Sequence, residues 1–259
     1  MAETHYPSRN LHGQMVHSIG RQILQGELRP GEPIPAQPDL PASRTAVREA
    51  TKVLVAKGLV ETRPRTGTRV RAREAWNMLD PDVLAWGYHG STSKALLRSI
   101  TEVRSIVEPA AAELAARRAT PAQLVGLERA FRDMETAMPA DGPGDVGAFV
   151  AADTRFHTAV FRAAGNDLLE HMSGVIYSAL RFSFEATSRI PGSARASLPH
   201  HRAVLEAIRT RKPQRAGAAM RALVRRVVRK IEKMPREADG TQRRAGHRPA
   251  AARRRSKAR

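Results

Sequence analysis

Apolar residues recur at helical spacing near the start of the chain. Between positions 11 and 25 they come every four residues: Leu11, Met15, Ile19 and Ile23. This period predicts an amphipathic helix with one apolar face, which Gly26 stops. A second helix is expected from Ser43, a favourable N-cap, to about Lys57, with Gly58 as its C-terminal signal. The chain therefore begins with two helices separated by a Pro-rich stretch.

The second helix carries a basic stripe on the face opposite its apolar positions. Arg44, Arg48 and Lys52 follow one another at four-residue intervals. Two β-prone runs then flank the basic turn RPRTG at residues 63–67, which predicts a two-stranded hairpin. A basic helix followed by a basic hairpin is typical of a protein that reads the major groove and adds a flanking wing. The alternative is a charged face that is merely solvated.

Helical patterns also fill the second half of the chain. They lie at about 91–118, 121–137, 145–164, 167–190, 196–211 and 213–234. Because no alternating pattern appears among them, we predict an all-helical bundle and a mainly α protein. Four regions follow, namely a compact domain, a connector, the helical domain and a tail, at residues 1–75, 76–90, 91–234 and 235–259.

Composition excludes several classes of protein. The chain has no cysteine, which excludes disulfides, thiolate chemistry and zinc sites made of cysteine. No run is apolar enough for a membrane span or a signal peptide, so we expect a cytoplasmic protein. The net charge of +19 indicates nucleic acid or an anionic ligand as partner. Of this charge, +7 lies after position 234, in a tail that we expect to be disordered.

One set of side chains could bind a metal. Asp153 and His157 are four residues apart and would share a helix face, and His201 lies in a later helix. One carboxylate and two imidazoles suit a divalent ion of the zinc, nickel or manganese class. The alternative is an exposed ion pair and a surface histidine. A hydrolytic enzyme would also need a general base, for which Glu185 is the one nearby carboxylate that we can nominate.

The N-terminal region resembles a known DNA-binding family. The run SRTAVREATKVLVAKGLVETRPRTGTRV, with GELRPGEPIPA before it, is similar to a GntR-type winged helix-turn-helix over residues 9–72. The resemblance implies that the recognition helix and the wing contact DNA through Arg44, Thr45, Arg48, Arg63, Arg65 and Gly67.

The resemblance has one departure. The family places a full helix before the recognition helix, whereas this chain has only AQPDLPA, about four residues shorter. Proline opposes a helix interior by ~3 kcal/mol, so Pro38 and Pro41 predict a single turn or no helix there. A basic DNA contact of the family falls at Pro38. The alternative function is therefore an effector-binding protein whose degenerate motif and basic tail hold nucleic acid nonspecifically.

Residues 98–228 resemble the FCD effector domain of FadR-like GntR regulators. ADTRFHTAVFRAAGNDLL carries that domain's D-x-x-F-H pattern. The resemblance implies a divalent metal on Asp153, His157 and His201, while the fourth histidine of the family falls at Leu223. The site then has three protein ligands, or it is a metal-free anion pocket in which both histidines bind the effector directly.

Two arginines are candidate effector ligands by the same resemblance. Arg104 aligns with an arginine that faces the cavity, where it could bind a carboxylate through two bonds. Its alternative role is a salt bridge to Glu108, four residues later. Arg181 lies on another helix expected to border the cavity and is the weaker candidate.

The connector WNMLDPDVLAW resembles the linker of galactonate-responsive regulators. This resemblance implies a small carboxylate effector, a sugar acid such as galactonate or gluconate. The alternative is that its apolar residues only hold the two domains together: Trp76, Leu79, Val83, Leu84 and Trp86. In full, the resemblances imply a homodimeric transcriptional repressor that binds double-stranded operator DNA, and not an enzyme.

Overall fold

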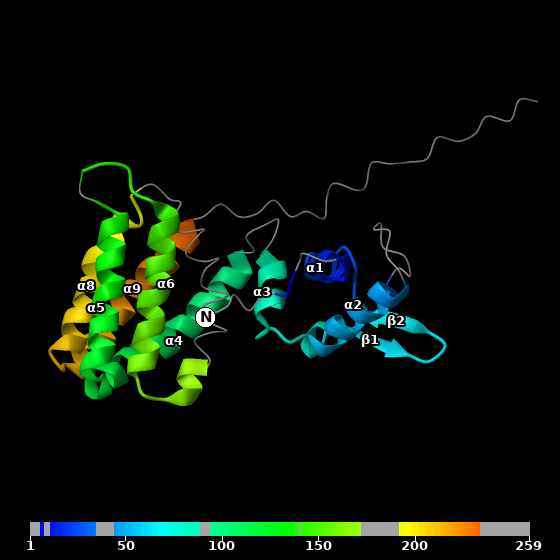
Figure 1. Ribbon diagram of the computed structural model, residues 1–259, viewed down its shortest axis with the longest axis horizontal. Helices are drawn as coiled ribbons and strands as arrows, with labels where there is room; N and C mark the ends of the chain where they lie inside the picture. The colour runs from blue at the N-terminus through cyan, green and yellow to red at the C-terminus, as the bar shows by residue number, and fades with distance from the viewer. Residues whose placement is uncertain are drawn as a thin grey trace, which may run out of the picture.

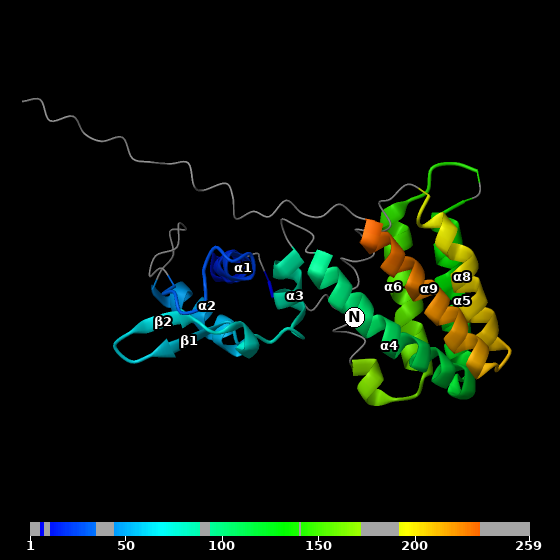
Figure 2. The same ribbon diagram turned by 180° about the vertical axis from the view of Figure 1, so that it is seen from behind.

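The computed structural model describes residues 6–7, 11–34, 44–88, 94–139, 141–171 and 192–233. The shortened helix expected before residue 44, Arg181, Glu185 and the basic tail lie outside these ranges. The described residues form two bodies at the ends of an elongated molecule, the head (residues 6–88) and the bundle (residues 94–233), as Figures 1 and 2 show.

The head contains two helices and one antiparallel hairpin: α1 (Leu11–Leu24), α2 (Arg44–Ala56), β1 (Val60–Arg63) and β2 (Gly67–Val70). The apolar face of α1 is buried against α2, as its four-residue period predicts. Gly58 follows α2 with a φ of 74°, and Gly67 has a φ of 75° where the hairpin turns. Glycine adopts this left-handed region without steric cost. The hairpin points away from the bundle (Figure 1).

The connector packs against the head. It contains a short 3-10 helix, η1 (Arg73–Ala75), and the helix α3 (Pro81–Tyr88). Trp76, Val83 and Trp86 belong to the same apolar core as α1 and α2, whereas the Leu79 side chain is 69% exposed. The indole Nε1 of Trp86 donates to His17 Nδ1 over 2.8 Å. These contacts hold the connector to the head, whereas the alternative considered from the sequence was that they hold the two domains together.

A buried ion cluster fixes the same connector to the end of α2. Lys57 Nζ donates to Asp80 Oδ1 over 2.8 Å and to Asp82 Oδ2 over 2.7 Å. Burial opposes the charge on the lysine, but the two carboxylates prevail and raise the pKa of Lys57. Asp82 also accepts from the backbone N–H of Tyr6 over 3.2 Å. The N-terminal segment, α2 and α3 thus meet at one charged cluster.

The bundle is all-helical over the described residues, as predicted. Its helices are α4 (Lys94–Arg118), α5 (Pro121–Ala137), α6 (Val146–Ala163), η2 (Arg195–Ser197), α8 (Leu198–Arg209) and α9 (Pro213–Lys233). Helix α4 packs along α9, α5 along α6, and α8 along α9. In the part of the chain that the structure describes, no helix is both long and apolar enough to cross a bilayer.

Small and aromatic side chains alternate in the core of the bundle. Four alanines of α4 are fully buried, so its backbone approaches its neighbours closely: Ala111, Ala112, Ala115 and Ala116. Phe149, Phe156 and Phe161 of α6 belong to the same core. Thr120 and Gln123 form a reciprocal capping box with Pro121 in the first turn of α5, which satisfies two N–H groups of the helix start.

Candidate functional site

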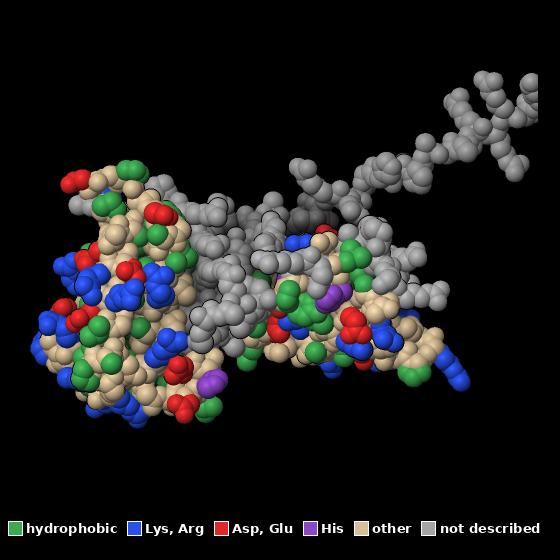
Figure 3. Space-filling model, in the orientation of Figure 1, with side chains coloured by type: hydrophobic (Ala, Val, Ile, Leu, Met, Phe, Trp, Pro, Cys, Tyr) green, Lys and Arg blue, Asp and Glu red, His purple; other side chains and the backbone are tan. Residues whose placement is uncertain are grey.

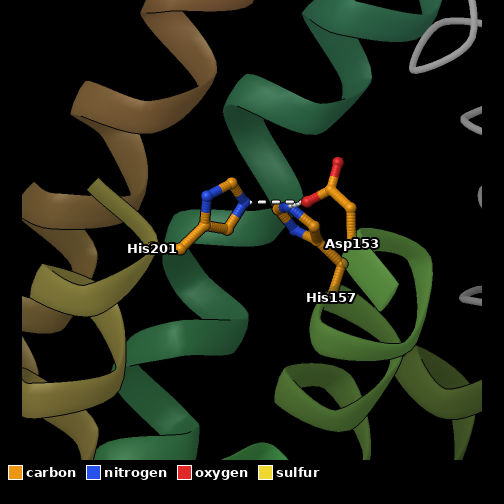
Figure 4. Close-up of side chains that lie close together, drawn as sticks. All are labelled: Asp153, His157 and His201. Atoms are coloured by element: carbon orange, nitrogen blue, oxygen red, sulfur yellow. Dashed lines mark ion pairs between the residues drawn. The ribbon is translucent and has the colours of Figure 1, made fainter. Parts of the chain in front are cut away.

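Asp153, His157 and His201 form one buried cluster inside the bundle. Helix α6 places Asp153 and His157 one turn apart on its inner face, and α8 brings His201 opposite them (Figure 4). His201 Nε2 lies 2.8 Å from Asp153 Oδ1, and His157 Nε2 lies 3.5 Å from the same oxygen. The three residues are at most 3% exposed. The alternative of an exposed ion pair and a surface histidine is therefore wrong.

His201 Nε2 faces Asp153 Oδ1 at close range. His201 Nδ1 lies 3.0 Å from the carbonyl oxygen of Ser197, and because a carbonyl only accepts, Nδ1 carries the hydrogen. In the neutral ring, Nε2 and Asp153 Oδ1 are then both acceptors facing each other at 2.8 Å. Both atoms are buried, and neither makes a well-directed hydrogen bond with a described residue. Such a pair needs a proton or a metal ion between its lone pairs.

The donor set fits a divalent ion. One ligand atom from each of Asp153, His157 and His201 lies within 4.8 Å of the others, so a single ion could touch all three. Two nitrogens and one oxygen leave at least one position open, as in sites that bind a further small ligand. Leu223 is 3% exposed and lines the same cavity, but its side chain has no lone pair to offer.

Glu108 of α4 joins the cluster from the other side. Its Oε2 lies 3.1 Å from His157 Nδ1. Its Oε1 accepts from Arg104 Nε over 2.6 Å, and both side chains of that pair are fully buried. The salt bridge considered as the alternative role for Arg104 is therefore present, and Arg104 also lines the cavity. Sequence reasoning treated Glu108 only as a partner of Arg104 and missed its contact with His157.

The buried charges stabilise one another. Burial alone would lower the pKa of His157, but Glu108 and Asp153 raise it to about 9. Burial would raise the pKa of Glu108, whereas Arg104 and His157 hold it at about 2. His201 and His157 likewise lower the pKa of Asp153 against the effect of burial. Without a metal ion, the cluster therefore carries charge on both carboxylates and on His157 at neutral pH.

Further cations from α9 border the cluster. A cavity of ≈ 30 Å³ is lined by Arg104, by the cluster itself and by Leu223, Arg226 and Lys230. Lys230 donates to Ser193 Oγ, and burial, together with the charge of Arg226, lowers the pKa of this lysine. Sequence reasoning missed Arg226 and Lys230. The signal was their spacing, since positions 223, 226, 227 and 230 share one face of a helix.

The predicted DNA-binding residues lie on the head. Arg48 of α2 and Arg63 of β1 are exposed over 72% and 65% of their side chains, and Thr45 is exposed near the start of α2. Arg44 is the first residue of α2, but the structure does not describe its side chain. Arg65 lies with Gly67 in the hairpin turn and has a φ of 66°. Figure 3 shows basic side chains at the far end of the head.

Helix α2 and the hairpin border a common groove. Arg48 and Lys52 line it on the helix side, and Thr62 and Thr68 line it on the hairpin side. Glu49 lies 2.9 Å from Lys52 Nζ and 3.7 Å from Arg48 Nε, so the two cations are held side by side. Two cations of the basic stripe therefore border the groove beside the hairpin, and the contact of this surface with DNA stays a prediction.

Comparison with known proteins assigns a family to each half of the chain. Residues 11–70 match the gntR family of bacterial regulatory proteins, and residues 99–226 match the FCD domain. The galactonate operon transcriptional repressor of Escherichia coli (strain K12) is 34% identical, over 85% of this chain and 96% of its own length. The Glc operon transcriptional activator of the same strain is 26% identical, over 82% and 85%.

Solved structures agree on the fold. The Lar protein of Listeria monocytogenes superposes with a TM-score of 0.57, covering 88% of this chain and 99% of its own. Its sequence identity is 17%, so this likeness concerns the fold alone.

Proposed function

Because the chain belongs to the GntR family of DNA-binding transcriptional regulators and carries an FCD domain, we propose that it is a repressor released by a small carboxylate. Family membership makes it a regulator and not an enzyme. The observation that carries the effector proposal is the buried cluster of Asp153, His157 and His201 beside the cations of Arg226 and Lys230. An anionic ligand suits this mixture of imidazole and cationic groups.

A sugar acid such as galactonate or gluconate is the proposed effector. The relative with 34% identity is named for the galactonate operon, and it is a repressor, which supports the same sign of regulation here. A sugar acid offers one carboxylate for the cations and several hydroxyl groups for Ser193, Ser197 and the imidazoles. Such contacts give specificity because buried polar groups that lose their partner cost about 1–3 kcal/mol each.

Metal binding is part of the proposal. Asp153, His157 and His201 would hold a divalent ion, which supplies open coordination positions for carboxylate or hydroxyl oxygens of the effector. Arg104 is then the neighbouring cation on α4, and Arg226 and Lys230 approach from α9. In the metal-free alternative, His157 and His201 bind the effector carboxylate themselves.

Effector binding must act on the head through linkage. The cavity of ≈ 30 Å³ holds an ion or about one water, so a sugar acid fits only after the surrounding helices move. An effector shifts operator binding only by its differential affinity for the two arrangements, and ~1.4 kcal/mol changes occupancy tenfold. We propose that the regulator works as a homodimer on a palindromic operator in the cytoplasm, each head reading one half-site.

The decisive experiment is a mobility shift on the DNA upstream of the protein's own gene. A panel of sugar acids is added with and without a chelator. Specific retardation that a sugar acid reverses is the expected result, and His157→Ala should bind DNA normally while losing the response. Equal retardation of random DNA would contradict specific operator binding. An unchanged response of the variant to the sugar acid would contradict the assignment of the effector pocket.

A further inference from the structure

Glu108 lies between the arginine and one histidine of the candidate metal site. It belongs to α4, across the core from α6, and its side chain is fully buried. Oε1 accepts from Arg104 Nε over 2.6 Å, and Oε2 lies 3.4 Å from Arg104 Nη2 and 3.1 Å from His157 Nδ1. The carboxylate therefore has a partner on each side and no access to solvent in which to reorient.

The two nitrogens of His157 face different carboxylates. Nδ1 lies beside Glu108, while Nε2 lies 3.5 Å from Asp153 Oδ1, on the side of the cluster. An imidazole can bind a metal through one nitrogen only when the other holds the hydrogen. A carboxylate beside Nδ1 holds that hydrogen in place, which leaves the lone pair of Nε2 for the ion. The ring orientation thus depends on Glu108.

We propose that Glu108 is the positioning residue of the metal site: it turns His157 Nε2 toward Asp153 and His201, and Arg104 holds Glu108 in place. The inference rests on the proposed metal binding. His201 has its own support, because its Nδ1 lies 3.0 Å from the carbonyl oxygen of Ser197. Both histidines are therefore oriented by residues that do not themselves bind the metal. This orientation compensates for the missing fourth ligand, whose position Leu223 occupies.

Glu108→Gln tests this role in the full chain. The change keeps the size of the side chain but removes its charge. Arg104 donates to Glu108, and His157 Nδ1 lies 3.1 Å from its other oxygen, so the glutamine NH₂ must now face one of these two cationic groups. Substituting a residue that orients a metal ligand through a hydrogen bond typically lowers metal affinity by about 10–100-fold. We expect titration with Zn²⁺ against a chelator to show that loss, and Co²⁺ to give weaker visible absorption at equal concentration.

Glu113→Gln is the matched control. Glu113 lies on the same helix and pairs with Arg221 Nη1 over 3.3 Å at the surface, with side chains 35% and 46% exposed. Its substitution should leave metal affinity unchanged. Glu108→Asp, which keeps the charge but withdraws it by one methylene, should fall between wild type and Glu108→Gln. It also supplies the comparison if Glu108→Gln does not fold.

The outcomes separate the two proposals. If the wild-type chain binds neither Zn²⁺ nor Co²⁺, the metal site itself fails, and the role of Glu108 toward it fails with it. If wild type binds the ions and both Glu108 variants bind them equally well, the metal site stands and the positioning role is overturned. A lower melting temperature with unchanged metal affinity would assign Glu108 a purely structural role.

Discussion

His157 lies between two buried carboxylates. Its ring lies between Glu108 and Asp153, and their carboxylates raise its pKa to about 9 despite complete burial. Each carboxylate is in turn stabilised by the imidazolium and by a second partner, Arg104 or His201. At this scale the site is a chain of alternating charges. Removing any member leaves a buried charge without its partner. The resulting loss of folding stability is larger than the stability that an exposed ion pair contributes.

The stability of the metal-free protein should fall as pH rises from about 6.5 to 9. A group with a raised folded pKa contributes fully below its unfolded pKa, near 6.5 for histidine, and loses the contribution as pH passes the folded value. We expect the melting temperature in chelator to drop by several degrees over this range, since each kcal/mol corresponds to about 2–4 °C in a protein of this size. Thermal melts at both pH values measure it.

His157→Gln is the comparison for that effect. The glutamine amide keeps hydrogen-bonding atoms but cannot be protonated. The difference in melting temperature between wild type and His157→Gln should therefore shrink between pH 6.5 and 9. Glu108, whose pKa is held at about 2, acts in the opposite sense and loses its contribution only in acid. A constant difference between the two proteins would show that His157 does not titrate in this range.

Arg48 of α2 is a predicted contact to the bases of the operator. Its side chain is 72% exposed on the face that carries the basic stripe. If it forms a bidentate contact with a base, Arg48→Ala should cost about 1–3 kcal/mol on operator DNA. Arg209→Ala, at an exposed site of α8 that pairs only locally with Glu206, is the control. Equal weakening on random DNA would make Arg48 a phosphate contact instead.

At the scale of elements, α3 belongs to the head. Trp86 is 2% exposed, and Gly20 of α1 lies directly beneath its ring, where a Cβ atom would collide with the indole. Gly58 has a similar relation to the backbone oxygen of Ala75. Two glycines thus permit the connector to lie close to α1 and to the end of α2. Helix α3 therefore packs closely against α1 and the end of α2.

Trp86→Ala should destabilise the head strongly. Removing a buried aromatic side chain of this size typically costs about 3–5 kcal/mol. Leu79→Ala is the control, because Leu79 is 69% exposed in the same connector and should change stability little. The fluorescence of Trp76, the other of the chain's 2 tryptophans, follows head unfolding in urea. A common midpoint for the two variants would contradict the packing of α3 on the head.

Sequence patterns predict elements better than the contacts between them. Helix α5 has the predicted bounds because Thr120 and Pro121 mark its start unambiguously. The hairpin and the buried face of α1 also follow from local patterns. The packing of the connector does not, since the position of Trp86 above Gly20 depends on residues 66 positions apart in the chain. Glu108, Arg226 and Lys230 join the site for the same reason, through contacts between helices.

At the scale of the whole molecule, the proposed function gives the basic charge two purposes. The head carries exposed arginines on one surface, whereas residues 235–259 add nine basic residues against two acidic ones. Charges on such a tail attract any duplex, and log affinity falls by about 0.9 per log unit of salt for each phosphate neutralised. Specific recognition must then come from the head alone.

Truncation after Met234 separates the two contributions. We expect the shortened chain to keep its preference for operator over random DNA while its affinity depends less steeply on salt. Mobility shifts at several salt concentrations measure both quantities. If all DNA affinity disappears with the tail, the specific repressor is excluded in favour of nonspecific binding.

A homodimer needs a surface that two copies can share. On α4, Val103 and Ile106 are 44% and 70% exposed and lie one turn apart, so they offer an apolar surface that the proposed homodimer could bury. Ile106→Glu should therefore shift the chain toward monomer in light scattering and weaken operator binding. Val125→Glu, at a 59% exposed position of α5, is the control. Dimers of unchanged stability in both variants would exclude this face.

The small size of the cavity also has a kinetic consequence. On the proposed function, a sugar acid enters a site of ≈ 30 Å³ only after the surrounding helices have moved. Association would then be limited by how often the bundle opens, and it would be slower than binding to a preformed site. Once the bundle has closed around a ligand, the same barrier delays release. The regulator would then respond slowly and keep its induced state after the effector is withdrawn.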